Sequence, residues 1–154
     1  MMSVLETGRA QEPLPTLEAA LKDEKVLADL LVRSVAVNLD GKHQREIDSV
    51  EFNAFVDKLG IVGPENSDRR GAVYSALHKL SKRATSEGID LQAKIKLAKE
   101  SGWRGFLSID APKQLRQAYE RNQKIRMVMA ALLTKISDEN RANNKDLSAN
   151  ATML

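Results

Sequence analysis

The chain has 154 residues, of which 42 % are hydrophobic, 29 % are charged and 4 % are aromatic. This length corresponds to one domain of ordinary size, which excludes a large multidomain enzyme. The absence of cysteine excludes a disulfide scaffold, a thiolate metal site and a cysteine nucleophile. The sequence has no apolar run long enough for a membrane helix and no secretory-signal pattern, so we expect a cytoplasmic protein without membrane contact.

The net charge of +3 hides two segments of opposite sign. Residues 1–68 carry 7 Lys and Arg against 13 Asp and Glu, whereas residues 69–126 carry 14 against 5. A basic segment of this kind indicates an anionic partner. Two other interpretations stay open: the acidic half docks on the basic half inside the fold, or the charges are solvated helix faces without a partner.

Capping residues predict the first two helices. Residues 1–15 are polar, hold two prolines and are predicted to be disordered. Thr16 is a good N-cap for a short helix over 17–22, and Asp23 is one for a stronger helix over about 24–38.

A polar loop is predicted next, over residues 39–47. Asp48 and Glu51 are three residues apart, the spacing of a capping box, and predict the start of another helix. That helix ends at about residue 59, because Gly60 follows and Gly63 and Pro64 confirm the break.

Two helices are predicted within the basic segment. The first begins at Ser67 or Asp68 and runs to about residue 86, with Gly88 ending it. Asp90 then caps a helix over 91–101. The apolar residues over 89–97 also alternate as a strand would, but the Ala and Lys content favours a helix.

The last predicted helix is the longest. Asp110 caps it, Pro112 lies in its first turn, and it runs to about Ser137. Residues 138–154 are rich in Asn, Asp and Ser and are predicted to be a flexible polar tail. We therefore expect an all-α fold, a small bundle of five to six helices with a long C-terminal helix. Its single domain spans 16–137, acidic over 16–68 and basic over 69–126.

Trp103 lies in a predicted turn between Gly102 and Gly105, surrounded by cations. Binding of nucleic acid needs cations for the phosphates and often a planar ring for exposed bases. The alternative is that Trp103 is a core anchor at a helix–turn–helix corner. The predicted nucleic-acid contacts are Arg69, Arg70, Lys79, Lys82, Arg83, Lys94, Lys96, Lys99, Trp103 and Arg104.

The segment from Ile89 to Phe106, IDLQAKIKLAKESGWRGF, resembles a segment of phage and plasmid replication accessory proteins. In that family a helix ends in a Gly-Trp-x-Gly-Phe/Ile turn, which Gly102, Trp103, Gly105 and Phe106 match here. The resemblance covers about 18 residues. In those proteins the segment lies near regions that contact a helicase or bind DNA, so the resemblance implies a role in replication.

A second stretch, Asp40 to Phe52, resembles a degenerate EF-hand loop. Asp40, Ile47 and Glu51 occupy the framework positions 1, 8 and 12 of such a loop. Lys42, Gln44 and Arg45 depart from it, because a calcium loop needs several carboxylate oxygens and a glycine at the sharp turn. We therefore expect no metal, and the capping roles of Asp48 and Glu51 explain their presence.

A heptad-like apolar seam runs along the last helix. Such a seam predicts either packing in the core of the chain or association with a second copy or a partner. The register-setting amide of Asn122 would lie on it. The predicted self-association residues are Leu115, Asn122, Ile125, Met129, Leu132 and Ile136.

No pattern in the sequence indicates catalysis or a cofactor. There is no phosphate-binding loop, and His43 and His78 have no third ligand at a zinc-like spacing. We therefore predict a non-catalytic nucleic-acid-associated protein without a cofactor or small-molecule substrate, a candidate phage or plasmid replication accessory factor that binds DNA or a replication protein. The alternative is a protein–protein adaptor, an inhibitor or a self-associating structural protein of a mobile element. It would act through the acidic N-terminal half or the last helix.

Overall fold

The computed structural model describes residues 13–39, 46–100 and 111–153, and within the last range it describes side chains for 112–144. These residues form five α-helices, one 3-10 turn (Pro64–Asn66) and a two-stranded ribbon. The helices are α2 (Leu17–Lys22), α3 (Glu24–Ser34), α4 (Ser49–Leu59), α5 (Ser67–Glu100) and α6 (Ala111–Met153). The predicted all-α fold with a long last helix is confirmed.

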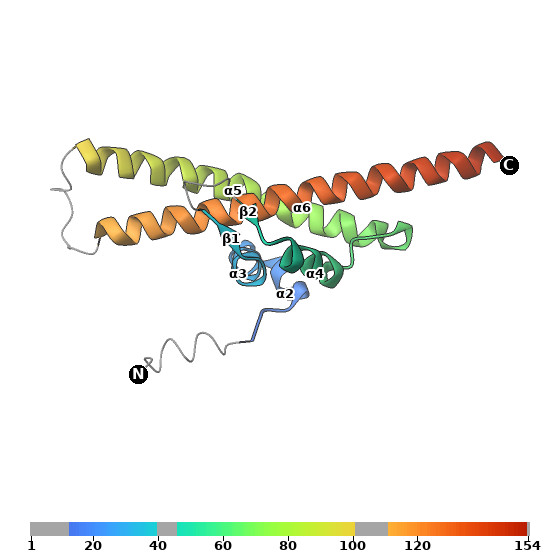
Figure 1. Ribbon diagram of the computed structural model, residues 1–154, viewed down its shortest axis with the longest axis horizontal. Coiled ribbons are helices and arrows are strands. Elements are labelled where there is room, and N and C mark those ends of the chain that lie inside the picture. Colours follow the sequence, from blue (N-terminus) through green and yellow to red (C-terminus); the bar gives the residue numbers. More distant parts are fainter. Residues whose placement is uncertain (1–12, 40–45, 101–110, 154) are drawn as a thin grey trace.

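Helices α5 and α6 form a long antiparallel pair, and the three shorter helices gather on one side of its middle (Figure 1). Two hydrogen bonds between side chains show the direction, since Arg70 bonds to Asn140 whereas Gln92 bonds to Tyr119. Both ends of the pair extend past the shorter helices (Figure 1). None of the helices in the described ranges is long and apolar enough to cross a membrane.

The core is a seam of aliphatic side chains between α5 and α6, closed by α3 and α4. Buried side chains recur every three or four residues along both long helices, as expected for helices that each bury one face. From α5 they include Val73, Leu77, Leu80 and Ala84, and from α6 Ile125, Val128, Met129, Leu132 and Ile136. Leu27, Leu30 and Leu31 of α3 and Phe55, Val56 and Leu59 of α4 complete the core. Each leucine buried in this way contributes about 1.5–3 kcal/mol.

The predicted N-caps of α2 and α3 are confirmed, but α3 is shorter than predicted. The Thr16 hydroxyl accepts a hydrogen bond from the Ala19 amide (3.2 Å), and the Asp23 carboxylate accepts one from the Lys25 amide (2.9 Å). Helix α3 ends at Ser34 instead of about residue 38. Residues Val37–Asn38 form strand β1, paired antiparallel with strand β2 (Glu46–Ile47). The β-branched residues near 35–37 favour this extended backbone once a partner strand is present.

Helix α4 starts and ends as predicted, although only half of the capping box forms. The Asp48 carboxylate accepts a hydrogen bond from the Glu51 amide (2.9 Å). The Glu51 carboxylate turns instead to the Ala36 amide (3.1 Å), and so ties α4 to the chain before β1. Gly60 ends the helix in the left-handed conformation, at φ 63°.

The basic segment contains one helix where two were predicted, because α5 passes through Gly88 without a break. The prediction of a helix end at Gly88 is therefore wrong, whereas the choice of helix over strand for residues 89–97 is confirmed. A Cβ atom at Gly88 would lie 2.7 Å from Oδ1 of Asn122 in α6. Asn122 is 4 % exposed and donates a hydrogen bond from Nδ2 to the Ala84 carbonyl (2.8 Å). The absence of a side chain at Gly88 thus allows α6 to approach α5 closely.

Helix α6 continues to Met153, so the predicted helix end near Ser137 is also wrong. Residues just beyond that point hold the helix to the loop after α4. The Glu139 carboxylate accepts a hydrogen bond from the Gly63 amide (3.0 Å), and Asn140 Oδ1 accepts one from Arg70 (2.8 Å). These tertiary contacts stabilise a helical turn whose polar composition suggested a tail.

Candidate functional site

Arg70 was predicted to contact nucleic acid, but the structure buries it at 2 % exposure. Its guanidinium donates hydrogen bonds to the Ile61 carbonyl (2.9 Å), to the Gly63 carbonyl and to Asn140. All of these acceptors belong to the loop after α4 or to α6. Arg70 is therefore a structural residue that joins this loop to the helical pair, and its guanidinium is not available to a phosphate.

Three more of the predicted cations face the acidic N-terminal half. Arg69 lies 3.7 Å from the Glu18 carboxylate, and Arg83 lies 3.4 Å from that of Glu24. Hydrogen bonds to Glu87 and then to Glu24 raise the pKa of Arg83 above its ordinary value. Lys79 lines a small hollow beside α2 and the start of α3. In this part of α5 the two halves of the chain do neutralise each other.

The remaining predicted cations of α5 are lysines. Lys94 pairs with Asp90 one turn earlier (3.0 Å). Lys82, Lys96 and Lys99 are exposed and have no hydrogen bond or ion pair within the described part of the chain. Trp103 and Arg104 lie outside the described residues, as do Gly102, Gly105 and Phe106 of the resembling segment.

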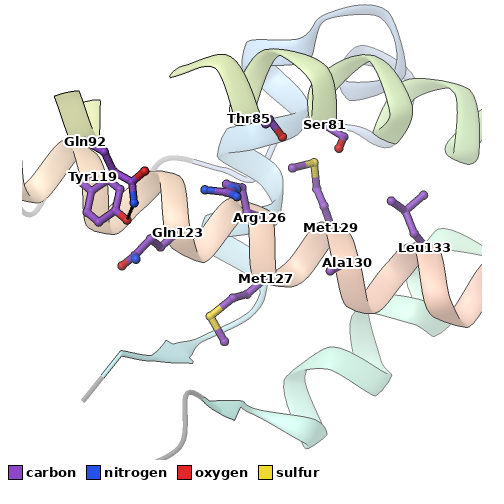
Figure 2. Close-up of a pocket in the computed structure, with 10 residues that line it drawn as sticks. All are labelled: Ser81, Thr85, Gln92, Tyr119, Gln123, Arg126, Met127, Met129, Ala130 and Leu133. Atoms are coloured by element: carbon purple, nitrogen blue, oxygen red, sulfur yellow. Dashed lines mark hydrogen bonds between the residues drawn. The ribbon is translucent and has the colours of Figure 1, made fainter. Parts of the chain in front are cut away.

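Two adjoining hollows, of about 610 Å³ and 340 Å³, form a groove between α5 and α6. Figure 2 shows the residues that line the larger hollow. The two hollows adjoin because both are lined by Gln92 and Tyr119, whose side chains are hydrogen-bonded (2.6 Å). From α5 the groove is lined by Ser81, Thr85, Gln92, Ile95, Lys96 and Lys99. From α6 it is lined by Tyr119, Gln123, Arg126, Met127, Met129, Ala130 and Leu133.

The groove lies on the side of the helical pair that faces away from α3. Arg83 and Glu87 flank the buried seam of α5 on the α3 side, where they line a hollow together with Glu24 of α3. Ser81 and Thr85 flank the same seam on the other side. We call the residues of the groove, together with Tyr74 and His78 on the same flank of α5, the open face.

The charges of the groove are all positive. Lys96 and Lys99 contribute from α5, and Arg126 rises from α6 toward α5 (Figure 2). Asp and Glu are absent from the described residues that line the two hollows. Arg126 also lacks a hydrogen bond or ion pair to any described residue. The sequence places Arg126 on the flank of the last helix, but only the packing of α5 against α6 brings it into the same groove as the lysines.

Tyr74 and His78 add an aromatic pair to the open face. Their rings stack at a centroid distance of 6.0 Å and an interplanar angle of 9°, and Tyr74 is 48 % exposed. The spacing 74, 78, 81, 85 places both on the flank of α5 that lines the groove. Sequence reasoning missed this pair, although two aromatic residues four apart in a basic helix are a usable signal.

The predicted self-association seam faces the interior of the chain. Ile125, Met129, Leu132 and Ile136 belong to the core, Asn122 bonds to α5, and Leu115 is half-buried. These side chains are committed to contacts within one chain. Self-association through them stays a prediction.

The stretch that resembles an EF-hand offers three described carboxylates, of which Glu46 lies exposed on β2 and the other two have other partners. Asp48 caps α4, and Glu51 holds the Ala36 amide. Asp40, Lys42, Gln44 and Arg45 lie outside the described residues. Over the ranges that the structure describes, no three His, Asp or Glu side chains gather in a way that could hold a metal ion.

The groove with its three cations is thus the most distinctive chemical feature of the described surface. Comparisons of this chain with models of protein families, with curated proteins and with solved structures find no match.

Proposed function

We propose that this protein binds nucleic acid, without catalysis, through the open face of the α5–α6 pair. One observation carries the proposal: Lys96, Lys99 and Arg126 line one groove that has no carboxylate among its described residues. Cations that lack an internal partner are available to the phosphates of a nucleic acid. Each phosphate that they neutralise releases condensed counterions, which is the main source of sequence-independent affinity.

The division of the cations along α5 supports this proposal. The three arginines in the first half of the helix have partners: Arg69 and Arg83 pair with the acidic half, and Arg70 bonds to backbone carbonyls. Of the lysines in the second half, Lys94 pairs with Asp90, whereas Lys96 and Lys99 have no partner among the described residues. The acidic half therefore neutralises the basic segment locally and leaves the open face positive.

A role in replication rests on the resemblance of residues 89–106 to phage and plasmid accessory proteins. Residues 89–100 of that segment contribute Lys96 and Lys99 to the groove. We propose that a replication factor of this kind would use the open face to hold DNA. The alternative of an adaptor, an inhibitor or a self-associating structural protein that acts through the last helix is less favoured, because the seam of that helix is already packed within the chain.

Fluorescence anisotropy tests the proposed function. Labelled single- and double-stranded oligonucleotides are titrated with the protein at about 50 mM and then about 200 mM salt, where phosphate contacts differ strongly in affinity. We expect binding at the lower salt that weakens steeply at the higher one. The proposal is wrong if neither oligonucleotide binds at about 50 mM salt.

A further inference from the structure

We infer that the nucleic acid held by the open face is single-stranded and lies along the groove between α5 and α6, with bases stacked on the Tyr74–His78 pair. This inference rests on the proposed function and specifies its ligand. It follows from the shape of the groove, from the order of chemical groups along it, and from the aromatic pair.

The shape of the groove favours a single strand. The axes of packed helices lie about 8–10 Å apart, so the groove between them is narrower than a duplex. A duplex would present only its phosphates to the rim, because its bases are paired and stacked inside. The unpaired bases of a single strand can contact the apolar side chains that line the groove, namely Met129, Ala130 and Leu133.

The groups along the groove suit both parts of a single strand, its bases and its phosphates. The aromatic pair lies at one end, Arg126 and Tyr119 lie in the middle, and Lys96 and Lys99 lie at the other end. Sites for single strands combine a positive groove that follows the backbone with rings on which bases stack. From Tyr74 to Lys99 the path along α5 is about 38 Å, enough for roughly ten nucleotides at the spacing of a stacked strand.

The aromatic pair supplies a surface on which bases can stack, which lysines cannot supply. Tyr74 and His78 are both exposed, and their nearly parallel rings form one platform on the flank of α5. Stacking of a base on such a ring is sequence-tolerant and raises affinity about five- to a hundredfold per base. A duplex of stacked, paired bases gains nothing from this platform.

The experiment compares three labelled probes of about 15 nucleotides, somewhat longer than the track: oligo(dT), oligo(U) and a mixed-sequence duplex. They are titrated with the wild-type chain and with three variants. Tyr74→Ala/His78→Ala removes the platform, Arg126→Gln removes the central cation, and Lys94→Gln is a matched control for a cation paired outside the groove. The side chains of all four residues are exposed, so circular dichroism should show an unchanged helical fold.

We expect the wild-type chain to bind a single strand about tenfold or more tightly than the duplex. The Tyr74→Ala/His78→Ala variant should lose about five- to a hundredfold in affinity for the single strand and keep its affinity for the duplex. Arg126→Gln should weaken binding of the single strand, whereas Lys94→Gln should not. The inference is supported if either oligo(dT) or oligo(U) binds more tightly than the duplex. The single strand that binds more tightly of the two identifies DNA or RNA as the ligand.

Two outcomes would overturn the inference, and they are distinguishable. If the duplex binds as tightly as the single strand and the platform variant behaves as wild type, the inference is wrong while nucleic-acid binding stands. If no probe binds at low salt, the proposed function is wrong and the inference falls with it.

Discussion

Gly88 and Asn122 show how one residue pair sets the distance between the two long helices. Asn122 reaches the Ala84 carbonyl of α5 across the position where any other residue at 88 would place its Cβ. Both residues are nearly inaccessible to solvent. A glycine in a helix interior costs roughly 0.5–1 kcal/mol relative to alanine, so the contact with Asn122 must offset that cost.

Substitution of Gly88 by alanine should therefore destabilise the protein. The new Cβ would displace Asn122 and force a local shift, at a cost of about 1–3 kcal/mol, which exceeds the gain in helix propensity of up to about 1 kcal/mol. Gly71→Ala is the matched control, because Gly71 lies in the same helix and a Cβ atom there would have nothing within 4 Å. Urea unfolding should show Gly71→Ala to be more stable than wild type and Gly88→Ala less stable. Equal stabilisation by both substitutions would contradict the close approach of Asn122 to Gly88.

Arg70 should contribute to stability and leave nucleic-acid binding unchanged. Replacing it by methionine would remove the donors for two carbonyls of the loop after α4 and for Asn140. Hydrogen bonds to a charged group are worth about 1.5–3 kcal/mol each, but burial of the methionine side chain offsets part of their loss. We therefore expect a loss of about 2–4 kcal/mol in the free energy of unfolding, within the usual range for a single substitution. Lys79→Met, at an exposed position, should change it by less than about 0.5 kcal/mol. A stable Arg70→Met variant with weakened binding would mean that Arg70 faces the ligand after all.

At the scale of residues, the sequence predicts what local chemistry determines. Thr16, Asp23, Asp48 and Gly60 cap their helices through backbone groups no more than three or four residues away. The environment of Gly88 could not be predicted in this way, because its partner lies 34 positions further along the chain. Arg70 was misassigned for a related reason, because its acceptors lie in the loop after α4 and in α6, outside its own helix.

At the scale of elements, the two flanks of α5 have different roles. One flank carries Arg83, which pairs with α3, and the other carries Lys96 and Lys99, which line the groove. The hydrophobic spacing of α5 predicts a helix with one buried side, but it does not determine which flank a neighbouring helix will cover. The open face could therefore not be located before the packing of α3 was known.

Removing the two groove lysines tests this difference between flanks. Lys96→Gln/Lys99→Gln should reduce the slope of log affinity against log salt by about 1.4 for a single strand, since each lost phosphate contact contributes about 0.7. Lys94→Gln should leave the slope unchanged, because this lysine is paired with Asp90 outside the groove. Binding isotherms at four or more salt concentrations give the slopes. An equal effect of all three lysines would show that the charge of α5 acts as a whole and that the groove has no special role.

Helix ends were predicted less well than helix positions. Helix α3 stops early because Val37 and Asn38 find a partner strand, and α6 continues because Glu139 and Asn140 bond to the loop after α4 and to Arg70. In both cases a tertiary contact outweighed the local preference of the sequence. The polar composition of residues 138–144 gave no signal of this contact.

At the scale of the whole molecule, the fold gives the two sides of the α5–α6 pair different charge. The acidic N-terminal helices lie on one side of the α5–α6 pair and neutralise the cations that face them (Figure 1). The opposite side keeps Lys96, Lys99 and Arg126 without internal partners among the described residues. We expect this distribution of charge to attract an anionic strand to one face and to repel it from the other, so that binding would have an orientation as well as an affinity.

The most direct test of this account is to map the bound strand on the protein by nuclear magnetic resonance. A ¹⁵N-labelled chain is titrated with oligo(dT) of about 15 nucleotides at low salt, and the shifts of backbone amides are followed. We predict that the largest changes occur in α5 between residues 74 and 99 and in α6 between residues 119 and 133, with little change in α2, α3 and α4. Changes concentrated in the three N-terminal helices, or no changes at saturating oligonucleotide, would contradict it.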